Sequence, residues 1–200
     1  MVADSAGNVG YVLEVQTKIH FPSPSVDLST LAHEFGHQWF GDNVGLTTWK
    51  EIWQNEGWAT FSDWYWTYHE NNGVTSPEQQ FTTNYTAGTG TPCPGGTNKW
   101  CTPPTDPDAA GLFDTFPVYT RGAMMLEALR EIVGDAKFFT IARRWPSEHR
   151  YGNATTAQFI ALCEEVSGFS GAQLDKLDLF FQQWLYGSGM PTITGSNFFS

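Results

Sequence analysis

Residues 33–37 have the sequence HEFGH, and eighteen residues separate the second histidine of this pentad from Glu56. On an α-helix, His33 and His37 are one turn apart and lie on the same face, so both imidazoles can reach one metal ion. Glu34 then points beside the metal, and Glu56 can supply a third ligand. This spacing predicts a zinc site. The alternative is a helix whose two histidines only cap or fill an amphipathic face.

The chemistry of such a site follows from its ligands. Two imidazoles and one carboxylate leave the fourth position of a tetrahedral zinc ion to water, whose pKa the metal lowers towards about 7. A carboxylate beside the metal can accept the proton of that water, and we predict this general-base role for Glu34. The pattern indicates a hydrolase with Zn2+ as its cofactor; other divalent metals also bind such ligands.

Composition limits the class of protein. The chain has 200 residues, 40% of them hydrophobic and 16% aromatic, which is enough for one domain with a buried core. The formal net charge is -11, with only ten lysines and arginines, and this argues against nucleic acid as a partner. No apolar run is long enough to cross a bilayer, so we expect a soluble chain without a membrane span. The acidity fits an extracellular or cell-surface parent protein.

The cysteines are expected to differ in environment. Cys93 and Cys101 flank a loop and are predicted to form a short-range disulfide in an oxidising compartment, or else to be two unpaired thiols. Zinc ligation by this pair is disfavoured, because no CxxC motif accompanies it. Cys163 lies in a helical pattern and is predicted to be buried and reduced.

Hydrophobic periodicity predicts a mainly helical fold. Residues 10–21 alternate apolar and polar side chains, which predicts a single edge strand, the only long one. Helices are expected from Asp27 or Ser29 to Gly41, over about 50–69, from 76 onwards, and over 118–133, 135–145, 155–166 and 173–186. Residues 86–117 are rich in Gly, Pro and Thr and are predicted to form one long loop. Since the first two helices carry the predicted ligands, they must pack closely together.

Several spaced motifs resemble those of the gluzincin aminopeptidases, the family that includes aminopeptidase N and leukotriene-A hydrolase. Residues 33–42, HEFGHQWFGD, resemble the zinc helix of that family. Residues 53–59, WQNEGWA, resemble its stretch with the third ligand, and residues 118–123, VYTRGA, resemble its later Tyr-x-Lys-Gly motif. Residues 184–191 resemble the end of its catalytic domain. The likeness covers about residues 13–191.

This resemblance implies a mainly α, thermolysin-like zinc peptidase catalytic domain over residues 1–200, with one short N-terminal strand region. It also implies that the domain was excised from a longer chain and lacks the family's N-terminal β-domain, as a strand without visible partner strands suggests. The implied activity is that of a zinc-dependent metallo-aminopeptidase that removes N-terminal residues from peptides. Peptide substrates are therefore the expected partners.

Three further residues receive roles from the resemblance. Tyr119 would donate a hydrogen bond to the oxyanion of the tetrahedral intermediate, unless it is a core residue that opens a helix. Asp63, seven residues after Glu56 and on the same helix face, would orient a zinc imidazole, unless it is a solvated surface carboxylate. Glu14 would bind the free ammonium group of a substrate, unless it is an exposed strand carboxylate. Around Glu14, residues 11–15 depart from the family's Gly-x-Met-Glu-Asn strand and keep only the glutamate.

Two other functions fit the same residues. A zinc endopeptidase of similar fold would leave Glu14 without a role. A zinc-bearing fragment could also be inactive without its missing domain, because that domain helps to form the substrate pocket in the family.

Overall fold

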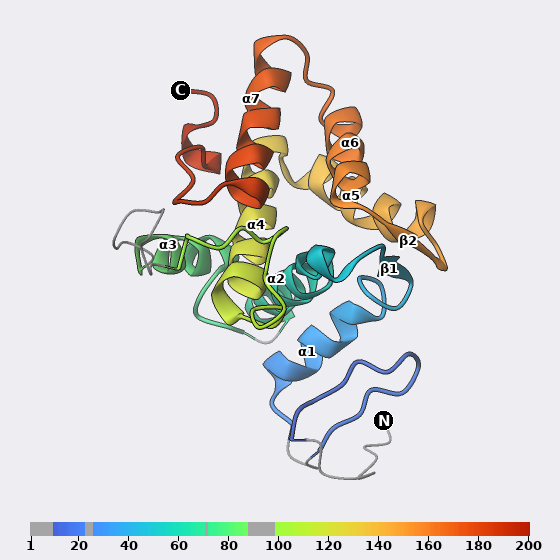
Figure 1. Cartoon of the computed structure of the whole chain (residues 1–200). Helices are drawn as coiled ribbons and strands as arrows, with labels where there is room; N and C mark the ends of the chain where they lie inside the picture. The colour runs from blue at the N-terminus through green and yellow to red at the C-terminus, as the bar shows by residue number, and fades with distance from the viewer. Residues whose placement is uncertain (1–9, 23–25, 71, 88–98) are drawn as a thin grey trace.

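A computed structural model describes the chain except residues 1–9, 23–25, 71 and 88–98, and the described part is mostly helical (Figure 1). The α-helices are α1 (Leu28–His37), α2 (Trp53–Glu70), α3 (Pro77–Ala87), α4 (Arg121–Val133), α5 (Asp135–Glu148), α6 (Thr156–Ser167) and α7 (Ala172–Phe181). Short 3-10 helical segments are η1 (Trp49–Glu51) and η4 (Gly195–Asn197), and π-helical segments are η2 (Thr115–Thr120) and η3 (Gln182–Tyr186). Strands β1 (Val44–Leu46) and β2 (Gly152–Ala154) pair in parallel.

Helix α1 has an N-terminal cap at Asp27 and is followed by a turn at Gly41. The Asp27 carboxylate caps the first turn by accepting a hydrogen bond from the Thr30 backbone N–H at 2.8 Å. After the helix, Gly41 takes a φ of 139°, which a residue with a side chain rarely adopts. The turn at Gly41 directs the chain into β1. The helix begins where the sequence predicts, but it ends at His37, four residues before Gly41.

Helices α1 and α2 pack closely because the glycine inside the HEFGH pentad has no side chain. A Cβ added at Gly36 would lie 3.1 Å from the Ala59 Cα and 3.2 Å from the Ser62 Cβ. These two residues belong to α2, so the backbones of the two helices lie almost in contact. The close approach brings Glu56, near the start of α2, beside the two histidines of α1.

Helix α2 makes a second close crossing on its other side, with α4 (Figure 1). A Cβ added at Gly57 would lie 3.0 Å from the Gly122 Cα, and one added at Gly122 would lie 2.9 Å from the Gly57 Cα. Gly57 directly follows Glu56, and Gly122 lies three residues after Tyr119. The close contact between these two glycines thus fixes the distance between Glu56 on α2 and Tyr119.

Aromatic side chains fill the core around α2 and α4. The largest fully buried side chains include Trp53, Trp58, Trp100, Trp145 and Trp184. Trp53, Trp64 and Trp184 are all buried, so these side chains serve packing.

The predicted helices are confirmed, but the prediction of one long strand over residues 10–21 is wrong. The chain reverses within this segment: Lys18 N–H donates to the Val15 carbonyl at 3.0 Å, and Leu13 forms an antiparallel bridge with His20. Thr17 takes a φ of 66° in the turn. Alternation alone does not encode such a reversal, because neither Gly nor Pro marks the turn. The segment forms a hairpin, residues 11–20.

The two paired strands of the structure lie elsewhere than expected. Strands β1 and β2 have three residues each and are more than a hundred residues apart in sequence. Such short strands have no alternation of apolar and polar residues from which they could be predicted. The fold is mainly α, as predicted, and its sheet is small.

Two further predictions concern the cysteines and membrane-spanning helices. Cys163 is buried and free, as expected, whereas Cys93 lies outside the described residues. Among the helices of the described part, none is both long and apolar enough to cross a membrane.

Candidate metal centre and active site

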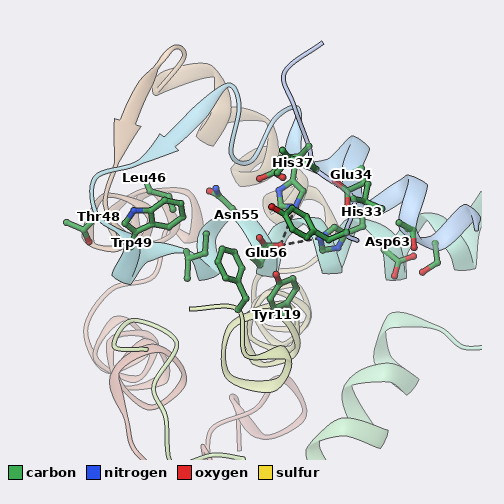
Figure 2. A pocket seen from close by; sticks show the side chains of 18 of the residues that line it. His33, Glu34, His37, Leu46, Thr48, Trp49, Asn55, Glu56, Asp63 and Tyr119 are labelled. Atoms are coloured by element: carbon green, nitrogen blue, oxygen red, sulfur yellow. Dashed lines mark hydrogen bonds and ion pairs between the residues drawn. The ribbon is translucent and has the colours of Figure 1, made fainter. Parts of the chain in front are cut away.

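The three predicted ligands come together as a triangle of donor atoms (Figure 2). The Nε2 atom of His33 lies 3.2 Å from the Oε2 atom of Glu56, and the Nε2 atom of His37 lies 3.2 Å from the same oxygen. The two Nε2 atoms are 3.1 Å apart. A tetrahedral zinc ion with bonds of about 2.0–2.1 Å holds its ligand atoms about 3.3–3.4 Å apart. The triangle therefore has nearly the size that zinc requires.

Electrostatics within the triangle keep the carboxylate ionised. Burial alone would raise the pKa of Glu56, but hydrogen bonds with His33 and His37 outweigh burial and lower that pKa to about 2. Burial would likewise lower the pKa of His37, yet Glu56 raises it to about 9. An ionised carboxylate facing two imidazoles is a donor set that fits a divalent cation.

The second ring nitrogen of His37 has its own partner. Nδ1 lies 3.2 Å from the backbone carbonyl oxygen of Phe40, which can only accept a hydrogen bond. Donation from Nδ1 leaves Nε2 free to bind a metal and holds the ring in place. No sequence pattern predicts this contact, because the acceptor is a backbone atom.

Glu34 lies on α1 between the histidines and is 7% exposed. Burial raises its pKa above the ordinary value, although the nearby charges of His37 and His33 oppose that rise. A carboxyl group with a raised pKa accepts a proton more readily near neutral pH. Glu34 therefore has the location and the environment of a general base.

Tyr119 faces the triangle from η2, the π-helical segment before α4 (Figure 2). Its ring stacks on that of His33, with centroids 6.0 Å apart and planes at 17°, and its hydroxyl hydrogen-bonds with Glu56. Burial and the charge of Glu56 raise the pKa of Tyr119, so that its hydroxyl keeps its proton and remains a donor. Segments of π-helix often occur at functional sites.

All seven residues predicted for the site line one cavity of about 1200 Å³. They are Glu14, His33, Glu34, His37, Glu56, Asp63 and Tyr119. Leu46 and Trp49 line the end of the cavity away from Asp63 (Figure 2). Among the described residues that form the wall, none is a lysine or an arginine. The cavity is therefore acidic, which favours a cationic group on its ligand.

Like Glu34 and Tyr119, Asp63 and Glu14 lie beside the triangle rather than in it. Asp63 accepts a hydrogen bond from the Thr67 hydroxyl at 3.0 Å and another from Ser29, and burial raises its pKa. The charge of His33 opposes this rise in the pKa of Asp63. Glu14 lies on the hairpin, and its charge contributes to raising the pKa of Glu34. Orientation of an imidazole by Asp63 and amine binding by Glu14 stay predictions.

The aromatic wall of the cavity is not predictable from the sequence. Trp49 and Phe113 line it, with 63% and 59% of their surfaces exposed, and their ring centroids lie 6.4 Å apart. A patch of exposed, large aromatic side chains is a structural signal of binding, but it cannot be seen in a sequence.

Comparisons with known proteins agree with this geometry. The chain is 27% identical over 175 residues to aminopeptidase N of Lactococcus lactis subsp. cremoris. The match covers 83% of this chain and 19% of that protein. It is 28% identical over 170 residues to the tricorn protease-interacting factor F2 of Thermoplasma acidophilum, covering 82% of this chain and 20% of that protein. The chain thus spans about a fifth of the length of these curated relatives.

Solved structures show the same fold. The M1 zinc metallopeptidase of Deinococcus radiodurans superposes with a TM-score of 0.74 at 26% identity, covering 92% of this chain and 38% of that chain. Yeast LTA4 hydrolase superposes with a TM-score of 0.58 at 22% identity, covering 83% of this chain and 27% of that chain. The family model described as the peptidase family M1 domain matches residues 22–184. This chain belongs to peptidase family M1, as its resemblance to the gluzincin aminopeptidases predicted.

Proposed function

We propose that the chain is the catalytic domain of a zinc-dependent aminopeptidase that removes N-terminal residues from peptides. The observation that carries the proposal is the triangle of His33, His37 and Glu56, with edges of 3.1 to 3.2 Å, in a cavity that Glu34 and Tyr119 also line. Membership of peptidase family M1 and the names of the relatives support it. A thermolysin-like arrangement of the whole catalytic domain, over residues 1–200 of a longer chain, is part of the same proposal.

The proposed mechanism assigns one task to each residue. His33, His37 and Glu56 would hold the zinc ion, which when bound would supply a water molecule of lowered pKa and a Lewis acid for the substrate carbonyl. Glu34 accepts the proton of the attacking water and passes it to the leaving amine. Tyr119 donates its hydroxyl proton in a hydrogen bond to the oxygen on which negative charge develops.

Selection of the N-terminus rests on the acidic character of the cavity. A carboxylate at a fixed distance from the scissile bond would bind the ammonium group of a substrate by electrostatic attraction, and Glu14 is the proposed carboxylate. The lack of a basic residue among the described wall residues supports a cationic group over a carboxylate at this place. Asp63 is proposed to support His33 electrostatically. An extracellular or cell-surface location stays a prediction.

The replacement Glu34→Gln tests the proposed mechanism. The amide keeps the shape of the side chain but cannot accept the proton, so kcat should fall by about 10²- to 10⁴-fold. The zinc content, measured by plasma mass spectrometry, should stay that of the unmodified chain. Full activity in the variant would remove Glu34 from the mechanism.

A pair of substrates distinguishes the proposal from its alternatives. An aminopeptidase should cleave a peptide with a free amine much faster than its N-acetylated twin, whereas an endopeptidase should cleave both at equal rates. A chain that binds one zinc ion yet cleaves neither peptide would be a zinc-bearing fragment without activity of its own. Zinc analysis and the peptidase assay on one sample therefore separate all three.

A further inference from the structure

Gln38 directly follows the ligand His37, and its side-chain amide contacts the hairpin of residues 11–20. The Oε1 atom accepts a hydrogen bond from the Thr17 backbone N–H at 3.0 Å. The Nε2 atom donates to the Glu14 backbone carbonyl at 3.2 Å and to the Asp42 carboxylate at 2.8 Å. The amide thus connects the end of α1 to the first arm of the hairpin and to its turn.

Only one orientation of the Gln38 amide satisfies these partners. The Thr17 N–H can only donate, so it must face Oε1, whereas the Glu14 carbonyl and the Asp42 carboxylate can only accept, so they must face Nε2. A glutamine is therefore specifically suited to this position. A glutamate would keep the contact with Thr17 but would turn acceptors towards the other two groups.

The hairpin depends on contacts of this kind. Its own hydrogen bonds in the described structure are the Leu13–His20 pair, at 3.0 and 2.8 Å, and the turn bond from Lys18 to Val15. An isolated two-stranded hairpin is only marginally stable in water. Thr17 also takes a φ of 66°, which is unfavourable for a β-branched residue and persists only where neighbouring groups hold it. Gln38 holds the N–H of this same residue.

The hairpin forms part of the active-site wall. Val12, Leu13 and Glu14 line the cavity that His33 and Glu34 also line. The hydrogen bond from Gln38 goes to the backbone of Glu14 itself, and Gln38 is joined by one peptide bond to a metal ligand. We propose that Gln38 is a positioning residue that holds the hairpin against α1 and so sets the place of the Glu14 carboxylate relative to the metal ligands. As far as it concerns the substrate ammonium group, this inference rests on the proposed function.

The replacement Gln38→Met is the main test, because it keeps the length of the side chain and removes all three hydrogen bonds. Amide hydrogen exchange of the zinc-loaded chain should become faster at Thr17 and across residues 11–20, and stay unchanged in α4. Gln173→Met is the matched control, since Gln173 is exposed on α7 and distant in the fold from the hairpin. If exchange in the hairpin is unchanged in Gln38→Met, the inference is overturned.

Kinetics test the consequence for substrate selection. Displacement of the Glu14 carboxylate should weaken binding of the substrate ammonium group more than it slows the chemical step. Gln38→Met should therefore lower kcat/KM for a free-amine peptide by about 10-fold, mainly by raising KM. Cleavage of the N-acetylated twin and the zinc content should not change. A merely structural defect would instead lower both activities together and reduce bound zinc, and that result would contradict the inference.

A double-mutant cycle shows whether Gln38 acts through Glu14. In a chain that already carries Glu14→Gln, the further replacement Gln38→Met should have no additional effect on free-amine substrates. Additive losses would show that Gln38 acts by another route. Gln38→Glu provides a second single variant, and it should impair selection at least as strongly because it faces Asp42 with a second carboxylate.

The design separates this inference from the proposed function. If the unmodified chain cleaves free and acetylated peptides equally, amine selection by Glu14 is refuted, and with it the kinetic part of the inference. The exchange experiment still decides whether Gln38 holds the hairpin.

Discussion

His37 shows how single residues of the site serve both packing and chemistry. It is 2% exposed; its Nδ1 atom contacts the Phe40 carbonyl and its Nε2 atom contacts Glu56. Fixing both nitrogens leaves the ring one orientation, the one that a metal ion would need. Glu56 is held in the same way by two imidazoles and a tyrosine hydroxyl.

Tyr119→Phe removes one hydroxyl and leaves the ring stacked on His33. If the hydroxyl stabilises the oxyanion, kcat should fall by about 10²- to 10³-fold, because loss of one such donor has this effect in comparable sites. KM, bound zinc and the melting temperature should change little. An unchanged kcat would show that Tyr119 serves packing alone.

Among single residues, the sequence predicted that the side chains of His33, His37 and Glu56 come together, because the HEFGH spacing follows from helix geometry. It could not predict the Phe40 carbonyl or the Gln38 contacts, because these depend on how separate segments meet. The same limit applies to Trp49 and Phe113, which are far apart in sequence and share one cavity wall.

Helix α2 is the element on which the site depends, because it packs between α1 and α4 (Figure 1). Gly36 permits the first contact, and Gly57 with Gly122 permits the second. The helices themselves were predictable from periodicity and caps, whereas the hairpin and the β1–β2 pair were not. Their turns and pairings lack the local signals on which sequence prediction relies.

Gly122→Ala tests the crossing of α2 and α4. Its new Cβ would lie 2.9 Å from the Gly57 Cα. Overpacking of this kind costs typically 1–3 kcal/mol, of which the higher helix propensity of alanine offsets about 1 kcal/mol. We expect a loss of up to about 2 kcal/mol in the free energy of unfolding, measured in urea, and reduced activity. In Gly152→Ala the nearest atom lies at 3.4 Å, so this control should stay close to the unmodified chain.

The carboxyl group of Glu131 on α4 should make stability depend on pH. Desolvation, with repulsion from Glu127 and Glu78, raises its pKa from the ordinary 4.5 to about 7. The folded chain therefore binds this proton more tightly than the unfolded chain. The resulting stabilisation is complete below about pH 4.5 and is lost as the pH rises through about 7.

Glu131→Gln should remove this dependence. The difference in free energy of unfolding between pH 5 and pH 8 should be smaller in the variant than in the unmodified chain, with zinc saturating in both. Glu70→Gln, at an exposed position at the end of α2, is the matched control and should leave the difference unchanged. An identical pH dependence in Glu131→Gln would contradict the pKa assignment.

Over the whole molecule, the candidate site joins two helices that are separate in sequence. His33 and His37 belong to α1, at the edge of the fold, and Glu56 belongs to the central α2 (Figure 1). A metal ion bound by both helices would stabilise the folded state, because the unfolded chain does not present the three ligands together.

Removal of the metal tests this role in stability. Zinc at about 100 times its dissociation constant contributes about 2.7 kcal/mol, which corresponds to about 5–10 °C in the melting temperature of a chain of this size. We expect chelation to lower the melting temperature by that amount and added zinc to restore it. A chain with His37→Ala should show no response to zinc, and a response equal to that of the unmodified chain would place the ion elsewhere.

The central claim is that His33, His37 and Glu56 bind one zinc ion together. Anomalous X-ray diffraction at the zinc edge, from crystals of the zinc-loaded chain, tests it most directly. The result that we predict is one strong peak at about 2.0–2.2 Å from the Nε2 atoms of both histidines and from an oxygen of Glu56. A peak elsewhere, or three side chains too far apart to share one ion, would contradict the claim.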